Sequence, residues 1–119
     1  MLEELKKVKD LNVINITQNL FEVECNKDSV NNILKKLKEN SSFLFEQLLD
    51  ITAVDHPSRE YRFDLIYIVQ TLKNNKKLLL KTSLKENESA QSITSIHKAA
   101  DWYERECYDL FGIEFLNHP

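Results

Sequence analysis

The last sixteen residues decide how the rest of the chain is interpreted, and they run Glu104-Arg-Glu-Cys-Tyr-Asp-Leu-Phe-Gly-Ile-Glu-Phe-Leu-Asn-His-Pro119. Gly112 is the only glycine among 119 residues, whereas glycine makes up about 7 % of an average soluble domain. A glycine that is used once is expected where no side chain is tolerated. We predict that Gly112 occupies the left-handed position that ends a helix.

Apolar residues recur at spacings of three and four before this glycine, and they predict a helix over residues 95–111. The predicted buried face of this helix consists of Ile96, Ala99, Ala100, Tyr103, Cys107, Leu110 and Phe111.

A second stripe on the same helix consists of Trp102, Arg105, Glu106 and Asp109. The two acidic residues lie near the helix C-terminus, where the helix dipole favours cations by about 0.3–1 kcal/mol per charge. Acidic residues at this end of a helix depart from that preference, and such local departures often occur at functional sites. The departure favours a polar docking surface. The structural alternative is that Arg105 pairs with Asp109 one turn on, a contact worth about 0.2–0.5 kcal/mol. The residues alone leave both interpretations open.

The first third of the chain predicts a hairpin and a helix. Residues 1–9 have apolar positions at helical spacing, but this stretch is too short for a stable isolated helix, so we expect a frayed or docked turn. Alternating residues predict strands over 12–17 and 20–25, joined as a hairpin. A polar N-cap and one apolar face predict a helix over 29–39.

The middle of the chain predicts three more strands. Branched residues favour a strand over 51–54, and an alternating pattern predicts another over 62–69. Asn74-Asn75 suits a two-residue turn because asparagine accepts positive φ, and residues 77–82 then return as the partner strand. The polar stretch 83–91 is expected to form an exposed loop.

The predicted order of elements is therefore β-β-α-β-β-β-α, and a length of 119 residues indicates a single domain over 1–119. Strands in hairpins with two main helices that can cover one sheet face predict the α+β class. We expect a two-layer sandwich with a mostly antiparallel sheet.

Charge and composition argue against several functions. Sixteen basic and nineteen acidic residues give a net charge of −3, which offers no electrostatic case for nucleic-acid binding. No apolar run approaches the ~18 residues that cross a bilayer, so we expect no direct membrane insertion. We therefore expect a cytoplasmic protein, or one that is soluble on one side of a membrane complex.

The residues that carry chemistry do not form a recognisable site. The histidines at 56, 97 and 118 lack the spacing of a metal site, and a single glycine cannot build a phosphate-binding loop. Cys25 and Cys107 cannot supply the four thiolates of an ordinary iron–sulfur cluster. We predict no catalytic residue, no bound metal and no cofactor.

The signature Glu104-Arg105-Glu106, followed by Asp109-Leu110-Phe111-Gly112-Ile113 and His118-Pro119, resembles that of the 30-kDa subunit family of respiratory complex I. This family includes the C subunit of NADH:quinone oxidoreductases and the related small subunit of energy-converting nickel-iron hydrogenases. The similarity extends upstream through residues 48–55, the arginine-containing strand and residues 100–103. It covers about residues 30–119.

The resemblance implies a cofactor-free structural subunit of a membrane-associated oxidoreductase complex, not catalytic by itself and peripheral on the cytoplasmic face. Its partners would be the large hydrogenase-like (49-kDa-type) subunit and other subunits of the hydrophilic arm. The partner-interface residues carried over, with aromatic anchors added, are Trp102, Glu104, Arg105, Glu106, Asp109, Phe111, Gly112, Phe115 and His118.

The positions of the arginines indicate that Asp55, Arg59 and Arg62 support the partner interface. All three arginines of the chain fall in the family-like regions, and arginine is the usual choice for interface ion pairs. Either Arg59 or Arg62 pairs with Asp109 or Glu106 inside the chain, or these groups pair across an interface.

Two departures bear on the branch of the family. Asn117 stands where the family usually has glycine, a change that is compatible with a left-handed conformation. The chain ends at Pro119, whereas complex I members typically continue; it is either trimmed or a short member, and the short form is more like the hydrogenase branch.

The alternative functions are a free-standing protein-interaction domain without a redox role and, with less support, an independent enzyme.

Overall fold

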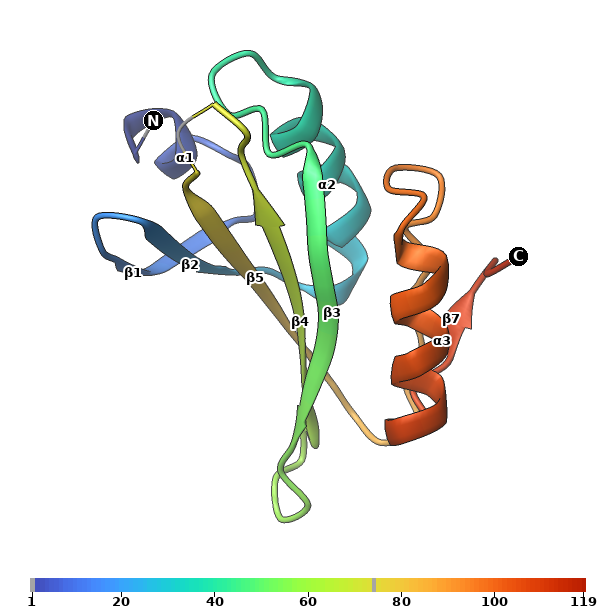
Figure 1. Ribbon diagram of the computed structural model, residues 1–119. Helices are drawn as coiled ribbons and strands as arrows, with labels where there is room; N and C mark the ends of the chain where they lie inside the picture. The colour runs from blue at the N-terminus through green and yellow to red at the C-terminus, as the bar shows by residue number, and fades with distance from the viewer. Residues whose placement is uncertain (1, 74) are drawn as a thin grey trace.

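A five-stranded sheet forms one layer of the molecule (Figure 1), and the computed structural model describes residues 2–73 and 75–119. The strand order is β1-β2-β5-β4-β3. Only β2 and β5 run parallel among the pairs within this sheet; the other three pairs are antiparallel. The strands are β1 (Asn12–Ile16), β2 (Leu20–Glu24), β3 (Gln47–Asp55), β4 (Phe63–Gln70) and β5 (Lys77–Leu84).

Helices form the second layer. They are α1 (Leu2–Lys6), the short 3-10 helix η1 (Lys27–Ser29), α2 (Val30–Glu39) and α3 (Ala100–Phe111). Figure 1 shows α2 and α3 on the same side of the sheet, with α3 running beside β3. The α+β class and the two-layer arrangement are confirmed.

The core forms because one face of each central strand is apolar. Leu65, Tyr67 and Val69 of β4 are fully buried, and the intervening residues Ile66 and Ile68 are half-buried on the other face. The antiparallel register places Tyr67 between Ile51 of β3 and Leu80 of β5. Because successive side chains of a strand point to opposite faces, the alternating apolar residues form one face of the sheet, and the helices cover this face.

The stretch predicted as the loop 83–91 is more structured than expected. Strand β5 continues to Leu84, and β6 (Ala90–Gln91) pairs in parallel with β7 (Phe115–Leu116). The Ala90 N–H donates to the Glu114 carbonyl at 3.0 Å, and Ala90 is buried. The prediction of a wholly exposed loop is therefore wrong, because its last residues pair with a segment more than twenty positions away.

The last helix is shorter than predicted and turns different residues inward. It begins at Ala100, since residues 93–97 form turns instead. Ala99 and Leu110 are exposed, although their spacing predicts both on the buried face, and Leu110 reaches 70 % exposure. Glu104 occupies the buried face in their place at 1 % exposure.

The end of this helix follows the prediction. Gly112 has φ = 73°, and its N–H donates to the Tyr108 carbonyl at 2.8 Å. Asn117 also has a positive φ of 64°, as does Asn75 at 56°. The other half of the predicted turn, Asn74, and the first residue, Met1, lie outside the described residues.

Candidate functional site

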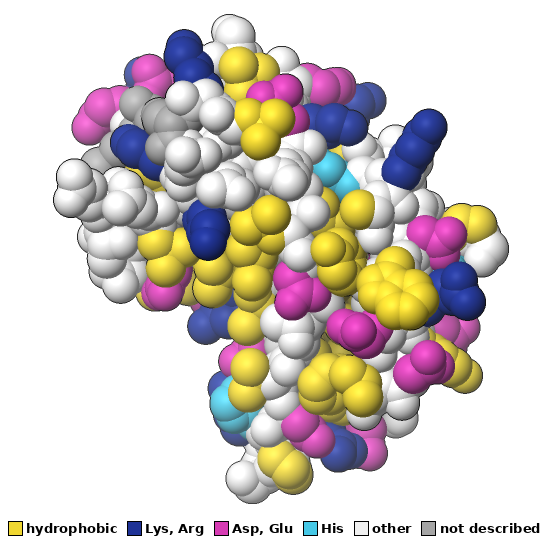
Figure 2. All heavy atoms as spheres, viewed as in Figure 1, with side chains coloured by type: hydrophobic (Ala, Val, Ile, Leu, Met, Phe, Trp, Pro, Cys, Tyr) yellow, Lys and Arg dark blue, Asp and Glu magenta, His cyan; other side chains and the backbone are white. Residues whose placement is uncertain are grey.

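The side of α3 that faces away from the sheet carries large apolar side chains. Trp102 is 64 % exposed, Tyr108 58 % and Leu110 70 %. We call this surface the α3 outer face, defined as Trp102, Arg105, Glu106, Tyr108, Asp109 and Leu110. With 3.6 residues per turn, Trp102 and Asp109 lie on one line two turns apart, and the other four residues lie on either side of that line. Figure 2 shows hydrophobic and acidic side chains interspersed over this part of the molecule.

The charges of the α3 outer face have no ionic partners among the described residues. Arg105, Glu106 and Asp109 are exposed, and none forms an ion pair with another residue in 2–73 or 75–119. The helix pair Arg105–Asp109 considered from the sequence is therefore absent from the described structure. These three charges are available to a group outside the chain.

The other two arginines are paired internally, with residues other than Asp109 and Glu106. Arg62 Nε and Nη2 donate to the two carboxylate oxygens of Asp55 at 2.8 and 2.9 Å, and Nη1 donates to Glu86 at 2.8 Å. Arg59 Nη2 donates to Asp64 at 2.8 Å. Of the two alternatives left open by the sequence, internal pairing of Arg59 or Arg62 with Asp109 or Glu106 is not found among the described residues, because both arginines lie at the end of the β3–β4 hairpin and bind the carboxylates there.

The pKa of Asp64, at this end of the hairpin, is set by burial and by neighbouring cations acting in opposite directions. Burial raises the pKa of its carboxyl, but the hydrogen bond and charge of Arg59 outweigh burial and leave the pKa below its ordinary value. His56 Nε2, at 3.1 Å, adds to the same effect. Asp55, Arg59 and Arg62 therefore stabilise the end of the β3–β4 hairpin, and among the described residues none of them forms an ion pair with the α3 outer face.

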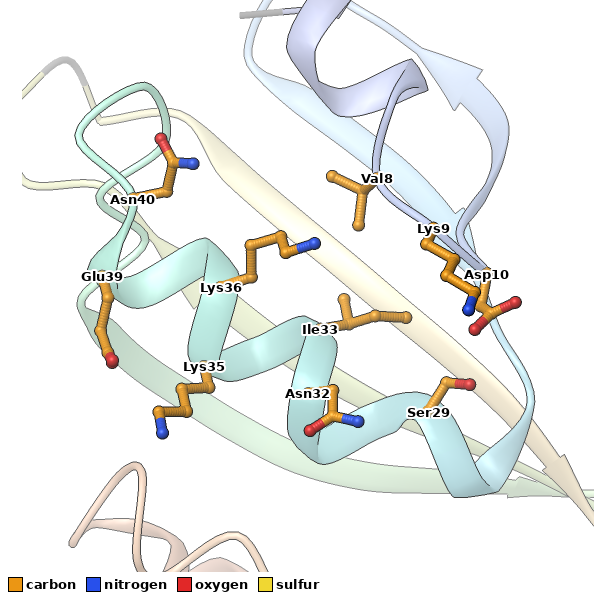
Figure 3. Close-up of a pocket in the computed structure, with 10 residues that line it drawn as sticks. All are labelled: Val8, Lys9, Asp10, Ser29, Asn32, Ile33, Lys35, Lys36, Glu39 and Asn40. Atoms are coloured by element: carbon orange, nitrogen blue, oxygen red, sulfur yellow. The ribbon is translucent and has the colours of Figure 1, made fainter.

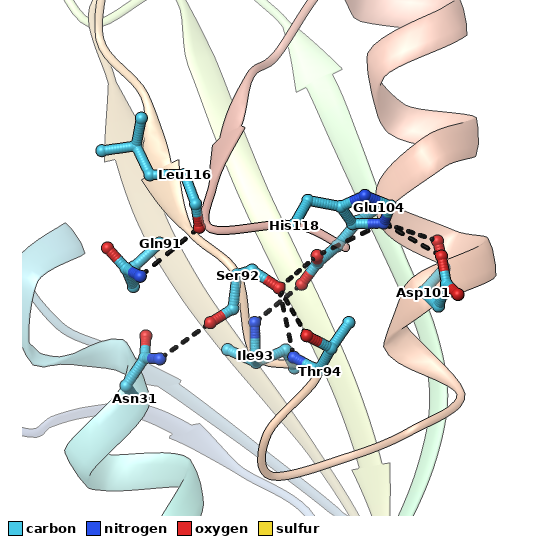
Figure 4. A network of polar contacts seen from close by, with 9 residues as sticks. All are labelled: Asn31, Gln91, Ser92, Ile93, Thr94, Asp101, Glu104, Leu116 and His118. Atoms are coloured by element: carbon cyan, nitrogen blue, oxygen red, sulfur yellow. Dashed lines mark hydrogen bonds and ion pairs between the residues drawn. The ribbon is translucent and has the colours of Figure 1, made fainter.

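Glu104 lies in the interior, at the centre of a polar network (Figure 4). One carboxylate oxygen accepts from Ser92 Oγ at 2.7 Å and the other from the Ile93 N–H at 2.8 Å. Asn31 of α2 donates to the Ser92 carbonyl at 2.9 Å, so the network joins both helices to the segment between them. Burial raises the pKa of Glu104, while these hydrogen bonds and His118 oppose the rise.

His118 belongs to the same network. Its Nε2 lies 3.1 Å from Asp101 Oδ1 and 3.9 Å from Glu104 Oε1. The side chain retains 19 % exposure. It closes one side of a hollow of about 380 Å³ between α3 and β7, which Tyr108, Asp109 and Glu114 also line.

The remaining predicted residues divide between interior and surface. Phe115 is buried, and Phe111 is half-buried with its ring edge-on to Phe63 at 6.4 Å between centroids and 74° between planes. Gly112 is exposed and ends the helix. The predicted interface set thus contains most of the α3 outer face together with the residues that hold α3 in place.

The surroundings of both cysteines favour the neutral thiol over the thiolate. Burial raises the pKa of Cys107 to about 12, and its Sγ donates to the Ile51 carbonyl at 3.1 Å. Burial likewise raises the pKa of Cys25 to about 12. Within residues 2–73 and 75–119, no three His, Cys, Asp or Glu side chains converge as metal ligands, and none of the described helices is long and apolar enough to cross a membrane.

The segments that build β3, β4, β5 and α3 match a known protein family. Residues 23–119 match the family described as respiratory-chain NADH dehydrogenase, 30 Kd subunit. The chain belongs to this family. The resemblance seen in residues 104–119 is thereby confirmed, and it extends over the segments that build β3, β4, β5 and α3.

Relatives of the 30-kDa subunit family are similar along most of the chain. The C subunit of NADH-quinone oxidoreductase from Ruegeria pomeroyi is 36 % identical over 116 residues, covering 98 % of this chain and 58 % of the relative. The corresponding protein of Cereibacter sphaeroides is 42 % identical over 87 residues, covering 73 % and 44 %. The chain therefore spans about half the length of these curated relatives.

A solved structure shares the fold of this family member. A chain from the membrane-bound sulfane sulfur reductase (MBS), an archaeal respiratory membrane complex, superposes with a TM-score of 0.86 at 25 % identity. The superposition covers 99 % of this chain and 69 % of that chain. Its relatives thus include subunits of membrane-bound respiratory complexes.

The sequence pattern misses part of the α3 outer face. The spacing of Leu110 from Tyr103 and Cys107 fits an apolar stripe and so predicts burial, and no pattern distinguishes Tyr108. Tyr108 and Leu110 flank Asp109, and this alternation of apolar and acidic residues in the last turn was the available signal. Leu116 of β7, at 47 % exposure, was also missed.

Proposed function

We propose that this chain is a structural subunit, without a cofactor of its own, of a membrane-associated redox complex. The complex would be of the NADH:quinone oxidoreductase or energy-converting hydrogenase type. The chain docks the large hydrogenase-like subunit through the α3 outer face, on the cytoplasmic side of the membrane. Family membership supports the kind of complex, and the geometry of α3 supports the mode of docking.

The observation that carries this proposal is the exposure of Trp102 and Leu110 beside the unpaired Arg105. Tryptophan, tyrosine and arginine are the residues that most often dominate binding energy at protein interfaces. Burial of apolar area contributes about 25 cal/mol per Å². A helix that leaves such side chains in water, within the family-matched region, has the composition of an interface and not of an ordinary solvated face.

The docking role predicts that Arg105→Glu abolishes co-purification with the large subunit. A reversed charge places a carboxylate where the partner is expected to offer one, and repulsion across an interface costs several kcal/mol. The isolated domain should keep its melting temperature within a few degrees, because Arg105 makes no ion pair within residues 2–73 and 75–119. The measurement is affinity co-purification from cells that express the complex, together with thermal unfolding followed by circular dichroism.

The matched control is Lys35→Glu, which reverses an exposed charge on α2 and should leave co-purification unchanged. Retention of the large subunit by Arg105→Glu would contradict docking through α3 and favour a free-standing interaction domain. A collapse of the melting temperature would show that Arg105 supports the fold instead.

A further inference from the structure

Strand β4 is apolar on both of its faces. Leu65, Tyr67 and Val69 are buried under the helices. Ile66 and Ile68 point to the side of the sheet opposite α2 and α3 (Figure 1). A sheet that faces water on one side usually alternates apolar and polar residues, whereas a strand that is buried on both faces is apolar throughout. The sequence of β4 therefore indicates that this side of the sheet is covered in the assembled protein.

The strand register gathers the outward apolar residues into one patch. Ile68 lies directly opposite Leu79 of β5, and all three side chains are half-buried. Figure 2 shows that hydrophobic side chains gather over the sheet as well as over α3. We call this surface the outer sheet patch, defined as Ile66, Ile68, Leu79, Lys77 and Lys81.

The two lysines of the outer sheet patch are unpaired. Lys77 and Lys81 point to the same face as Leu79 because side chains two apart on a strand share a face. Neither forms an ion pair among the described residues. Asp64, the acidic residue of β4 on this face, is already bound by Arg59. Over β4 and β5 the face thus offers apolar groups and two positive charges.

A helix has the width of this patch. Neighbouring strands lie about 4.8 Å apart, and a helix with its side chains is about 10–12 Å across, so one helix covers about two strands. A helix along β4 and β5 leaves Asp50 and Glu22 at its flanks, because they belong to the next strands outward, opposite Ile68 and Leu79.

The spacing of the lysines also fits a helix. Four residues of strand separate Lys77 from Lys81 by about 13 Å, and two helical turns span about 11 Å. The long lysine side chains bridge the difference. Carboxylates two turns apart on a helix can therefore reach both lysines, with the apolar residues between them.

We propose that the outer sheet patch docks an amphipathic helix of a neighbouring subunit. The apolar stripe of that helix packs on Ile66, Ile68 and Leu79. Its carboxylates pair with Lys77 and Lys81. This inference rests on the proposed function only in that the neighbour belongs to the same complex. A chain that is bound at the α3 outer face and at the opposite side of its sheet joins two segments of the complex.

The first test is the affinity of two double variants for the complex depleted of this chain. Ile66→Thr/Ile68→Thr keeps branched residues in the strand but removes apolar area, and it should weaken binding about tenfold or more. Lys77→Glu/Lys81→Glu should weaken binding about tenfold or more at about 50 mM salt, and less at about 300 mM. Thermal unfolding confirms that each variant is folded.

The controls make the same changes elsewhere. Lys35→Glu/Lys36→Glu reverses two exposed lysines beside a hollow of about 640 Å³ on α2 (Figure 3) and should retain the affinity at both salt concentrations. Ile14→Thr changes a 46 % exposed isoleucine of β1, at the edge of the sheet, and should also bind as wild type.

A photo-reactive residue identifies the occupant. A benzophenone side chain in place of Leu79, irradiated in the assembled complex, should cross-link to a peptide of another subunit. Mass spectrometry should find in that peptide apolar residues at helical spacing and two acidic residues about seven or eight positions apart. A cross-link to lipid, to a second copy of this chain or to a peptide without this pattern would overturn the assignment, as would the absence of any cross-link.

The outcomes separate this inference from docking through α3. Unchanged affinity of both patch variants, with binding lost in Arg105→Glu, would overturn the outer sheet patch and leave docking through α3 intact. Binding retained in Arg105→Glu and lost in the patch variants would overturn docking through α3 and support the patch.

Discussion

Glu104 is a buried acid: its spacing from Ala100 and Cys107 places it on the inner face of α3, although a carboxylate is ordinarily exposed. Its carboxylate accepts from the Ser92 hydroxyl and the Ile93 N–H, so it satisfies a backbone donor that would otherwise be orphaned. An unsatisfied buried donor costs about 1–3 kcal/mol. Glu104 therefore acts as a clamp between α3 and the segment before it, and not as a contact residue on the α3 outer face.

This role predicts that Glu104→Gln lowers the free energy of unfolding at pH 7 by about 1–3 kcal/mol, because an amide cannot accept both hydrogen bonds. Equilibrium unfolding in urea measures the change. The matched control Glu106→Gln, on the same helix but exposed, should remain within about 0.5 kcal/mol of wild type. Equal stability of both variants would contradict the clamp.

Single residues with backbone constraints were the most predictable. Gly112 and Asn117 were both expected to tolerate the left-handed region, and both have positive φ. Such positions are predictable because the constraint is local to one residue. The spacing of Glu104 from Ala100 and Cys107 was a signal for its inward position, but its charge argued for exposure. Its hydrogen-bond partners were not predictable, because Ser92 and Ile93 reach the helix through a turn that no local pattern encodes.

At the scale of elements, the end of the β3–β4 hairpin is stabilised by paired charges. Asp64 is mostly buried, and it contacts Arg59, His56 and the Ser83 hydroxyl. The pKa of Asp64 is lowered in the folded state. A carboxyl with a lowered folded pKa contributes stability above its unfolded pKa of about 3.9, and this stability is lost as pH falls through the folded value.

Asp64→Asn is therefore expected to destabilise the domain by about 1 kcal/mol at pH 7, a modest value because Arg59 is half exposed. The difference from wild type should shrink toward pH 2, where the wild-type carboxyl is protonated as well. Urea unfolding at pH 7 and pH 2 measures both. A difference of the same size at both pH values would assign the role of Asp64 to packing instead of charge.

The elements themselves were predictable where the pattern was long. Strand β4 and helix α2 follow from periods of two and of three to four over eight to ten residues. The pairing of β6 with β7 was not predictable from the sequence, because each strand has only two residues and the two strands lie far apart along the chain. The start of α3 was placed too early because residues 95–99 have helical spacing yet form turns at 94–96 and 98–99, the first of which contacts α2 through a hydrogen bond from Lys38 Nζ to the Ile96 carbonyl.

At the scale of the whole molecule, stability depends on keeping a neutral histidine inside. His97 is 4 % exposed, and its Nε2 has no hydrogen-bond partner among the described residues. Burial, with a smaller contribution from Lys38, lowers the pKa of His97 to about 4. Between this value and the ordinary 6.5, the unfolded chain binds a proton that the folded chain does not. The free energy of unfolding must therefore fall as the pH is lowered through this range.

The expected loss attributable to His97 is on the order of 3 kcal/mol between pH 6.5 and 4. In His97→Gln this part of the decrease should disappear, so its unfolding curve should be flatter over the same range. Glu104 acts in the opposite direction, since its raised pKa makes stability fall as pH rises above about 4.5, but this contribution is common to both proteins and cancels in the comparison. Parallel curves for wild type and His97→Gln would mean that the pKa of the buried ring is the same in the folded and unfolded states, and would contradict a penalty for protonating His97 in the interior.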